Sequence, residues 1–129
     1  MSATKTAKPL VPLEAAVQIA VIDRLRILGV WTCHLQNEGR IEGTAHQRMI
    51  RGARRKAQGV RTGAPDLLCV HRDGRVAWLE VKRPGYRPSD VKPAQVECHE
   101  DLRERNQHVA IVTSQDEAVE ALRGFGWRI

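Results

Sequence analysis

Apolar and polar residues change their spacing several times along the chain, and each change predicts an element of secondary structure. Between residues 12 and 28, leucine and valine recur every three or four positions, as on one buried face of a helix, and Gly29 provides the stop. Residues 30–36 instead alternate apolar and polar, with Trp31 on the apolar side, as in a half-buried strand. A helix followed by the first strand of a sheet is therefore predicted to begin the ordered part of the chain.

Two short apolar runs in the middle of the chain predict a β-hairpin. Residues 67–71 and 75–82 are rich in β-branched and aromatic residues. The Asp-Gly pair at 73–74 between them favours a tight turn. Because side chains alternate faces along a strand, Glu80 and Lys82 are expected to share one face of the second strand, opposite its apolar neighbours.

The rest of the chain alternates between loops, helices and strands. Pro and Gly punctuate a predicted loop over 83–90. A helix over 93–106, a buried strand over 109–113, a helix over 114–122 and a short strand or tail over 124–129 complete the order. The whole pattern is helix, three strands, helix, strand and helix, which predicts an α/β sheet flanked by helices.

The helix predicted over 93–106 has two features that each allow two interpretations. Gln95, in its first turn, can reach back to cap the helix or forward to hold Lys82 or a phosphate. A repeating face farther along includes apolar residues that could serve the core or an interface between subunits. That face consists of Val96, His99, Leu102 and Arg103.

Length and composition limit the class of protein. A chain of 129 residues is large enough for one domain, expected over 12–129 after a polar arm at 1–11 that lacks periodicity. There is no apolar run of the ~20 residues needed to cross a bilayer and no signal-peptide pattern, so we expect a cytoplasmic protein without membrane contact. The three cysteines are far apart and form no Cys-x-x-Cys pair, which predicts core thiols rather than a zinc site or disulfides.

Positive charge is concentrated in one stretch. The chain has 21 Lys and Arg against 15 Asp and Glu, a net charge of +6, which favours a polyanion as partner. Residues 40–61 hold seven of the cations, three glycines and no apolar stripe, so we expect a segment, helical over 44–58, that lies over the sheet and contacts DNA or only solvent. It lacks aromatic residues, which argues against base stacking. The predicted DNA-binding residues are Arg48, Arg51, Arg54, Arg55, Lys56, Arg61 and, from the loop over 83–90, Arg83.

Asp66, Glu80 and Lys82 carry the main candidate chemistry. Asp66 begins the first hairpin strand beside the end of the second, so the hairpin is expected to bring two carboxylates and an ammonium together. Two carboxylates can hold Mg²⁺ or Mn²⁺ and leave positions for water and phosphate, while the lysine orients or deprotonates the attacking water. The alternative is structural, with Asp66 capping a turn and a solvated Glu80–Lys82 pair worth ~0–1 kcal/mol.

Two further acidic residues keep two interpretations each. Glu14 lies in the first turn of the first helix, where the helix dipole favours a carboxylate, or it adds an acidic group at the metal. Glu38 follows the first strand in a polar turn. It is either a loop carboxylate or another acid delivered to the end of the sheet.

Several motifs in a fixed order carry a family resemblance. They are Glu14, Asn37-Glu38-Gly39, the stretch from Gly59 to Leu67, Glu80-Val81-Lys82, and Gln95. In these motifs the chain resembles a stand-alone member of the VRR-NUC family of the PD-(D/E)xK nuclease superfamily, over about residues 12–122. The resemblance implies a restriction-endonuclease-like core, in which helices flank a mixed central sheet in the order αβββαβ.

The resemblance also implies roles for individual residues. Lys82 would be the catalytic lysine, with Gln95 beside it in the catalytic site. One departure is Lys92, which stands where the family commonly has serine and cannot accept a capping hydrogen bond as serine does. The implied metal ligands are Asp66, Glu80, the Val81 carbonyl and, directly or through water, Glu14.

By the same resemblance, the expected function is that of a Mg²⁺- or Mn²⁺-dependent DNA endonuclease. It would hydrolyse phosphodiester bonds, prefer branched DNA such as four-way junctions, and act as a homodimer in a bacterial cell, encoded by host or phage. The alternatives are a nuclease of linear or nicked duplex, a non-catalytic nucleic-acid-binding module, and a basic domain that binds protein. Intact Asp66, Glu80 and Lys82 argue against the binding module, which has no need of all three.

Overall fold

The computed structural model describes residues 12–35 and 42–129, so the predicted arm at 1–11, Glu38 and Arg40 lie outside the described residues. No helix in the described part is long and apolar enough to span a membrane. The elements are α1 (Glu14–Ile27), β1 (Trp31–His34), α2 (Ala45–Ala57), β2 (Leu67–Val70), β3 (Val76–Val81), the 3₁₀ turn η1 (Pro88–Asp90), α3 (Pro93–Glu104), β4 (His108–Val112) and α4 (Gln115–Gly124).

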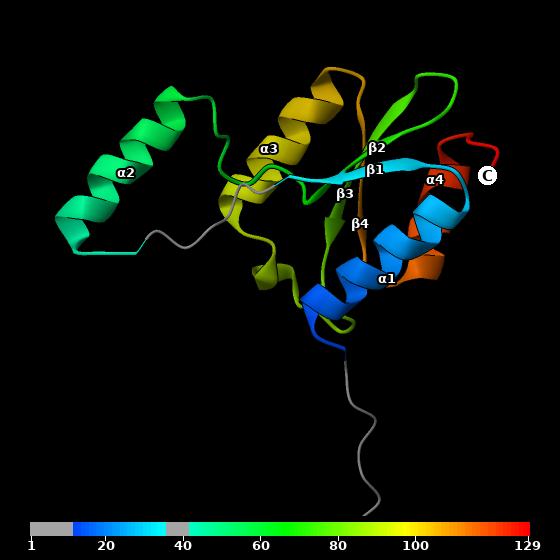
Figure 1. Ribbon diagram of the computed structural model, residues 1–129, viewed down its shortest axis with the longest axis horizontal. Coiled ribbons are helices and arrows are strands. Elements are labelled where there is room, and N and C mark those ends of the chain that lie inside the picture. The colour runs from blue at the N-terminus through cyan, green and yellow to red at the C-terminus, as the bar shows by residue number, and fades with distance from the viewer. Residues whose placement is uncertain (1–11, 36–41) are drawn as a thin grey trace, which may run out of the picture.

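A four-stranded sheet in the order β1-β2-β3-β4 forms the centre of the molecule. The first three strands are antiparallel neighbours, whereas β4 runs parallel to β3. Parallel neighbours need a long crossover connection, and α3 provides it here. Figure 1 shows helices on both sides of the sheet. The predicted α/β class, a mixed sheet flanked by helices, is therefore confirmed.

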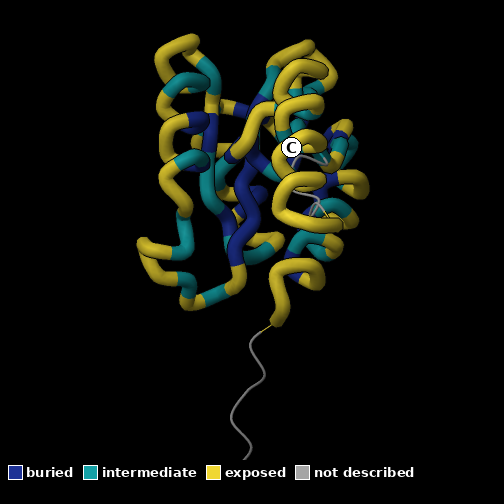
Figure 2. The backbone as a smooth tube through the Cα atoms, turned by 90° about the vertical axis from the view of Figure 1, so that its left-hand side faces the viewer, coloured by how far each residue is buried: buried dark blue, intermediate teal, exposed yellow. Residues whose placement is uncertain are grey.

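The hydrophobic core lies between the sheet and the helices α1 and α4. Val17, Val21 and Leu25 of α1 recur every four residues on one stripe, and all three are buried. Leu79 of β3 and Leu122 of α4 belong to the same core cluster. Figure 2 shows this buried centre beneath exposed outer turns of the helices. The packing occupies one face of β3 and leaves the other face to α3.

The predicted hairpin of β2 and β3 is confirmed. Its turn is closed by two backbone hydrogen bonds, from the His71 N–H to the Arg75 carbonyl at 2.8 Å and from the Gly74 N–H to the His71 carbonyl at 2.9 Å. Gly74 has a φ of +94°, a conformation that glycine adopts without steric cost. The Asp-Gly pair thus sits in the turn that it predicts.

Of the two uses predicted for the repeating face of α3, the core does not include Val96. Val96 is 42% exposed, and the buried side of the helix is formed by Gln95, Cys98 and His99. The reason is that α3 packs on the face of β3 that carries Glu80, so its inward positions are largely polar. Helical spacing alone does not reveal such a face, because an apolar stripe is the pattern that normally marks burial.

The end of the chain takes the second of its two predicted forms, a tail. Residues 124–129, all of them described, form no strand, and α4 extends to Gly124. Trp127 is only 2% exposed and belongs to the core cluster, while its indole ring contacts the His71 ring edge-on. The tail is therefore fixed by burial of one large side chain rather than by strand pairing.

The basic segment forms the helix α2, close to the range 44–58 predicted for it. Thr44 and Gln47 form a capping box: the Thr44 hydroxyl accepts from the Gln47 N–H at 3.2 Å, and the Gln47 side chain accepts from the Thr44 N–H at 3.0 Å. None of the residues of α2 is buried in the described structure. Figure 1 shows the helix standing beside the body of the molecule. The prediction that it lies over the sheet is wrong.

Candidate active site

The hairpin brings Asp66 to the end of β3. Asp66 directly precedes β2, and the antiparallel register pairs Leu67 with Leu79. Its carboxylate oxygen Oδ2 accepts a hydrogen bond of 2.7 Å from the Val81 N–H. This contact places Asp66 beside the backbone that joins Glu80 to Lys82, as the hairpin prediction required.

Glu80 is a buried carboxylate, and each of its two oxygens lies close to a side-chain nitrogen. It is 1% exposed, and its Oε1 accepts from Gln95 Nε2 at 3.0 Å and lies 3.8 Å from Lys82 Nζ. Its Oε2 lies 3.5 Å from His99 Nε2. A carboxylate taken out of water is costly unless hydrogen bonds and opposite charge compensate it. Residues of α3 and the end of β3 provide that compensation.

Lys82 is held by Gln95, which at the same time caps α3. Lys82 is 6% exposed, its Nζ donates to Gln95 Oε1 at 3.2 Å, and its backbone N–H donates to the Val112 carbonyl at 3.0 Å. Gln95 Oε1 also accepts from the Lys92 N–H at 2.9 Å. Both interpretations of Gln95 are therefore found together in the structure. The capping bond comes from Gln95, so the helix starts normally although Lys92 replaces a serine.

His99 is the neighbour of the site that sequence reasoning did not identify. It is 2% exposed and lies one helical turn after Gln95 on the same side of α3. Burial lowers the pKa of His99 below its ordinary value, and the charges of Arg103 and Lys82 lower it further, against an opposing effect of Asp66. The four-residue spacing from Gln95 was the available signal, but it acquires meaning only when α3 is placed on Glu80.

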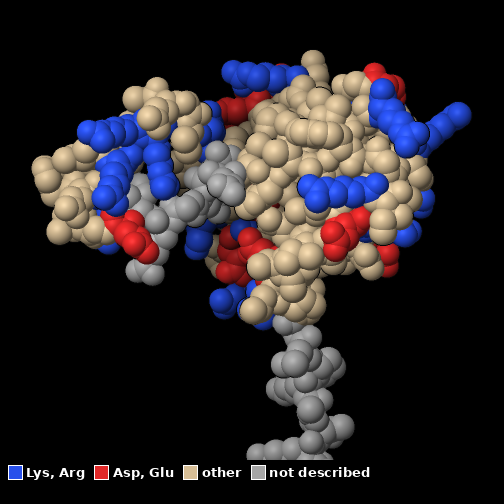
Figure 3. Space-filling model, in the orientation of Figure 1, with Lys and Arg blue, Asp and Glu red and all other residues tan. Residues whose placement is uncertain are grey.

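A cleft of about 1370 Å³ lies between α2 and the loop that follows Lys82, and of the site residues just described only Lys82 and Gln95 line it. Gly63, Lys82 and Gln95 line its inner end, and Glu14 from the start of α1 lies in the same lining. Figure 3 shows Lys and Arg side chains gathered on α2, apart from the body. The cations that line the cleft are Arg55, Lys56, Lys82, Arg83, Arg87 and Lys92.

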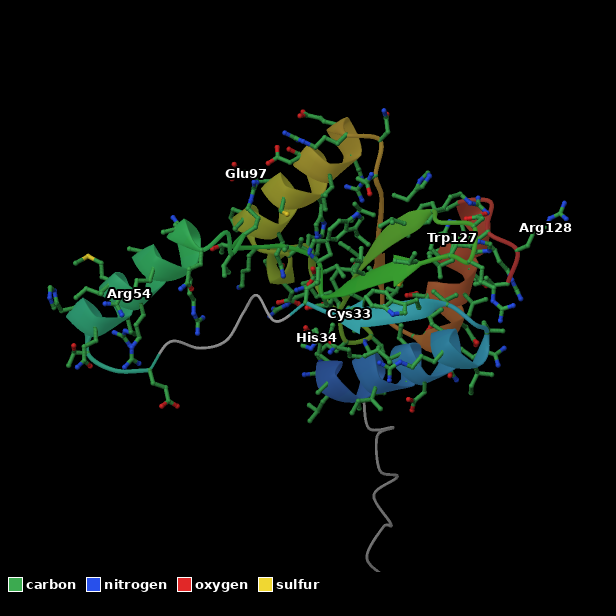
Figure 4. The ribbon with its side chains drawn as sticks, turned by 45° about the horizontal axis from the view of Figure 1, so that its top comes forward. Cys33, His34, Arg54, Glu97, Trp127 and Arg128 are labelled. Atoms are coloured by element: carbon green, nitrogen blue, oxygen red, sulfur yellow. The ribbon has the colours of Figure 1, made fainter. Side chains whose placement is uncertain are left out.

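The structure thus brings some predicted DNA-binding residues into the cleft and leaves others outside its lining. Arg55, Lys56 and Arg83 line it, whereas Arg87 and Lys92 line it without having been predicted. Among the rest, Arg51 Nη1 donates to the Glu42 carbonyl at 2.9 Å, Arg48 and Arg54 are exposed on α2, and Arg61 pairs with Asp101 of α3. Figure 4 shows Arg54 on α2, far from Arg128 at the other end of the molecule.

The donor set at the end of the hairpin suits a hard divalent cation. Within residues 12–35 and 42–129, no three His, Cys, Asp or Glu side chains gather closely enough to hold a metal by themselves. Two carboxylates, Asp66 and Glu80, together with the Val81 carbonyl supply only oxygen ligands. Mg²⁺ typically takes one or two carboxylates and keeps several waters, so this small set fits its chemistry.

Two of the comparisons with known proteins gave a match. A family model described as the VRR-NUC domain matches residues 14–116. A solved structure described as a VRR_NUC domain is 26% identical to this chain, with a TM-score of 0.59 over 87% of this chain and 96% of that one. No curated protein matches the chain. The matched residues include α1, the hairpin, α3 and β4, which together build the site.

Proposed function

The chain belongs to the VRR-NUC family and is therefore a nuclease domain, and from this premise we propose that it hydrolyses phosphodiester bonds in DNA with the help of Mg²⁺ or Mn²⁺. The observation that carries the proposal is the hydrogen-bonded group at the end of the hairpin, in which Lys82 and Gln95 line a cation-rich cleft and Asp66 and Glu80 lie directly behind them. Such a cleft attracts a polyanion and brings its backbone to Lys82, next to the two carboxylates.

Each residue of the group has a distinct role in the proposal. Asp66, Glu80 and the Val81 carbonyl hold the cation, and Glu14, which lines the same cleft, assists directly or through water. A bound divalent cation would polarise the scissile phosphate and lower the pKa of a coordinated water. Lys82 orients or deprotonates the attacking water and stabilises the charge that builds on the phosphate. Gln95 fixes the ammonium of Lys82 through the 3.2 Å hydrogen bond.

The proposed substrate is branched DNA, such as a four-way junction, cut within the chain by a homodimer. The family resemblance supports this choice, since two active sites in a dimer can meet two strands of a branch. The exposed cations on α2 and in the loop after Lys82 supply enough positive surface for backbone phosphates of such a substrate. A nuclease of linear or nicked duplex without junction preference is the runner-up.

The test compares Lys82→Met with Lys92→Met, which removes the same charge from an exposed position in the same cleft. End-labelled four-way junction, flap, nicked duplex, linear duplex and single-stranded DNA are incubated with Mg²⁺, Mn²⁺ or EDTA. We expect metal-dependent cutting by the wild type, a loss of about 10²–10⁴-fold in Lys82→Met, as when a group that acts in proton transfer is removed, and a much smaller loss in Lys92→Met.

The substrate pattern decides between the remaining alternatives. Symmetric nicks in the junction, together with a dimer mass in light scattering, support the junction-cutting homodimer. Equal cutting of junction and linear duplex supports the runner-up. A wild type that binds these DNAs and cuts none of them with either metal refutes catalysis and leaves a nucleic-acid-binding module. Absence of salt-dependent DNA binding leaves a basic domain that binds protein.

A further inference from the structure

Helix α3 presents one amide nitrogen and one ring nitrogen to the carboxylate of Glu80. Gln95 and His99 are four residues apart, so their side chains point in the same direction from the helix, and both are buried. Gln95 Nε2 donates to Glu80 Oε1 at 3.0 Å, and His99 Nε2 faces Glu80 Oε2 at 3.5 Å. Each oxygen of Glu80 therefore meets a nitrogen carried by the same rigid element.

The contact between His99 and Glu80 is close but not yet a full hydrogen bond. The 3.5 Å separation exceeds the ~2.7–3.2 Å of an N–H···O hydrogen bond. In the described part of the chain, His99 Nε2 has no hydrogen-bond partner. A carboxylate oxygen accepts hydrogen bonds, so the ring nitrogen that faces it is placed to donate. A small shift of the carboxylate completes the bond, and active-site hydrogen bonds commonly tighten in this way when ligand binds.

We propose that His99 is a positioning residue of the active site, which together with Gln95 holds the Glu80 carboxylate in the orientation that receives the divalent cation. This inference rests on the proposed function. One donor on each oxygen fixes the rotation of the carboxylate about its last bond, which a single donor does not fix. His99 itself acts only through Glu80.

The test measures Mn²⁺ binding in the absence of DNA, by titration calorimetry on the full chain. His99→Leu replaces the imidazole by an apolar side chain of similar size and so removes the donor, whereas His99→Gln keeps an N–H donor at similar reach. Loss of a partner that orients a metal ligand typically weakens metal binding by about 10–100-fold, and we expect that loss in His99→Leu and its recovery in His99→Gln. His108→Leu, an exposed histidine on β4, is the matched control and should bind Mn²⁺ as the wild type does.

Several outcomes overturn the inference. Equal Mn²⁺ affinity of His99→Leu and the wild type assigns His99 a purely structural role. Where His99→Leu does not fold, His99→Gln is compared with His99→Asn, whose amide is one methylene too short to reach Glu80, and equal affinities of these two polar variants also refute the inference. If the wild type binds no Mn²⁺ and cuts no DNA, the proposed function and this inference fail together. If the wild type binds Mn²⁺ and cuts DNA, and His99→Leu binds Mn²⁺ equally well, only the inference fails.

Discussion

Ionisable residues are buried on both faces of the sheet, but their surroundings differ. On the face covered by α3, Glu80 and Lys82 stay in contact through Gln95, which bonds to both. Burial of two charges costs about several kcal/mol per ion, so this arrangement contributes little to stability and instead holds reactive groups in a fixed geometry. On the core face, Cys69 is surrounded by apolar residues of the core cluster. Burial raises the pKa of its thiol to about 12, against a weaker lowering by the Thr32 hydroxyl, and the thiol stays neutral.

The Cys69 thiol is expected to make stability fall at high pH. The thiol ionises near its ordinary pKa of 9.0 in the unfolded chain and near about 12 in the folded protein. Between these values the unfolded state loses the proton and the folded state keeps it, so the free energy of unfolding falls as pH rises, by up to about 1.4 kcal/mol per pH unit.

Urea denaturation curves measured at pH 7.5 and at pH 10.5, about 3 pH units apart, check this expectation. The wild type should lose more stability across the interval than Cys69→Ala does, whereas Cys33→Ala, at a half-buried position, should match the wild type. Parallel losses in the wild type and Cys69→Ala would contradict the assigned pKa shift.

At the scale of elements, the connection from α2 to β2 is fixed against the start of α3. Gly63 has a φ of +85° and lies so close to the helix that an added Cβ would be 2.2 Å from the Ala94 carbonyl oxygen. Three residues later the chain reaches Asp66, whose carboxylate bonds to Val81. The close approach at Gly63 therefore positions one metal ligand candidate relative to the helix that carries Gln95 and His99.

Gly63→Ala is expected to destabilise the protein strongly. A left-handed conformation costs a non-glycine residue about 1–2 kcal/mol, and the clash with backbone atoms at Ala94 adds to it, so the total should exceed ~2 kcal/mol. Gly74→Ala is the matched control, because Gly74 also has a positive φ but has open space around its Cβ position. Denaturation midpoints in urea check the pair, and equal losses would mean that the approach to α3 imposes no constraint.

At the scale of the whole molecule, the structure separates a compact α/β body from a basic helix. α2 has five cations, no acidic residue and no buried residue. Its inner side lines the cleft with Met49, Gly52, Ala53 and Lys56, positions that recur at helical spacing, and Arg55 lies at the edge. Small side chains on that side leave room in the cleft, and the neighbouring cations provide charge. The geometry therefore suits a phosphate backbone that passes between α2 and the body.

The cleft cations are expected to set the salt dependence of DNA binding. Replacement of both Arg55 and Lys56 by Ala should weaken binding at low salt and reduce the slope of log affinity against log salt by ~2, about one for each lost phosphate contact. The control is the double variant Arg24→Ala and Arg128→Ala, which removes the same charge from exposed positions outside the cleft lining. Fluorescence anisotropy over a salt series measures both slopes. The same reduction in the control would show that only net charge matters.

Much of the fold and the centre of the candidate site could be predicted because their signals are local. Strand alternation and the Asp-Gly turn predicted the hairpin, and the hairpin register brings Asp66 to Val81. The position of Gln95 in the first turn of its helix predicted the capping bond that the structure contains. In each case the residues that interact are close in sequence or belong to neighbouring strands, so their geometry follows from the secondary structure itself.

Other features depended on packing between elements distant in sequence. The sequence left open whether Val96 serves the core or an interface, and the structure keeps it out of the core because α3 covers a polar strand face. The pairing of Arg61 with Asp101 joins residues 40 positions apart. Arg87 lines the cleft because of the path that the loop after Lys82 takes, and the sequence predicts only that a loop is present there.

The sequence by itself determined the order of helices and strands, the hairpin, and the identity of the two carboxylates and the lysine at its end. Only the tertiary structure decided that α3 lies on Glu80, that Gln95 and His99 face its two oxygens, and that α2 stands apart to form a cleft. The physical reason is that hydrogen-bonded turns and side-chain alternation act over a few residues. The partner of a buried charge, in contrast, is set by whichever distant element packs against it.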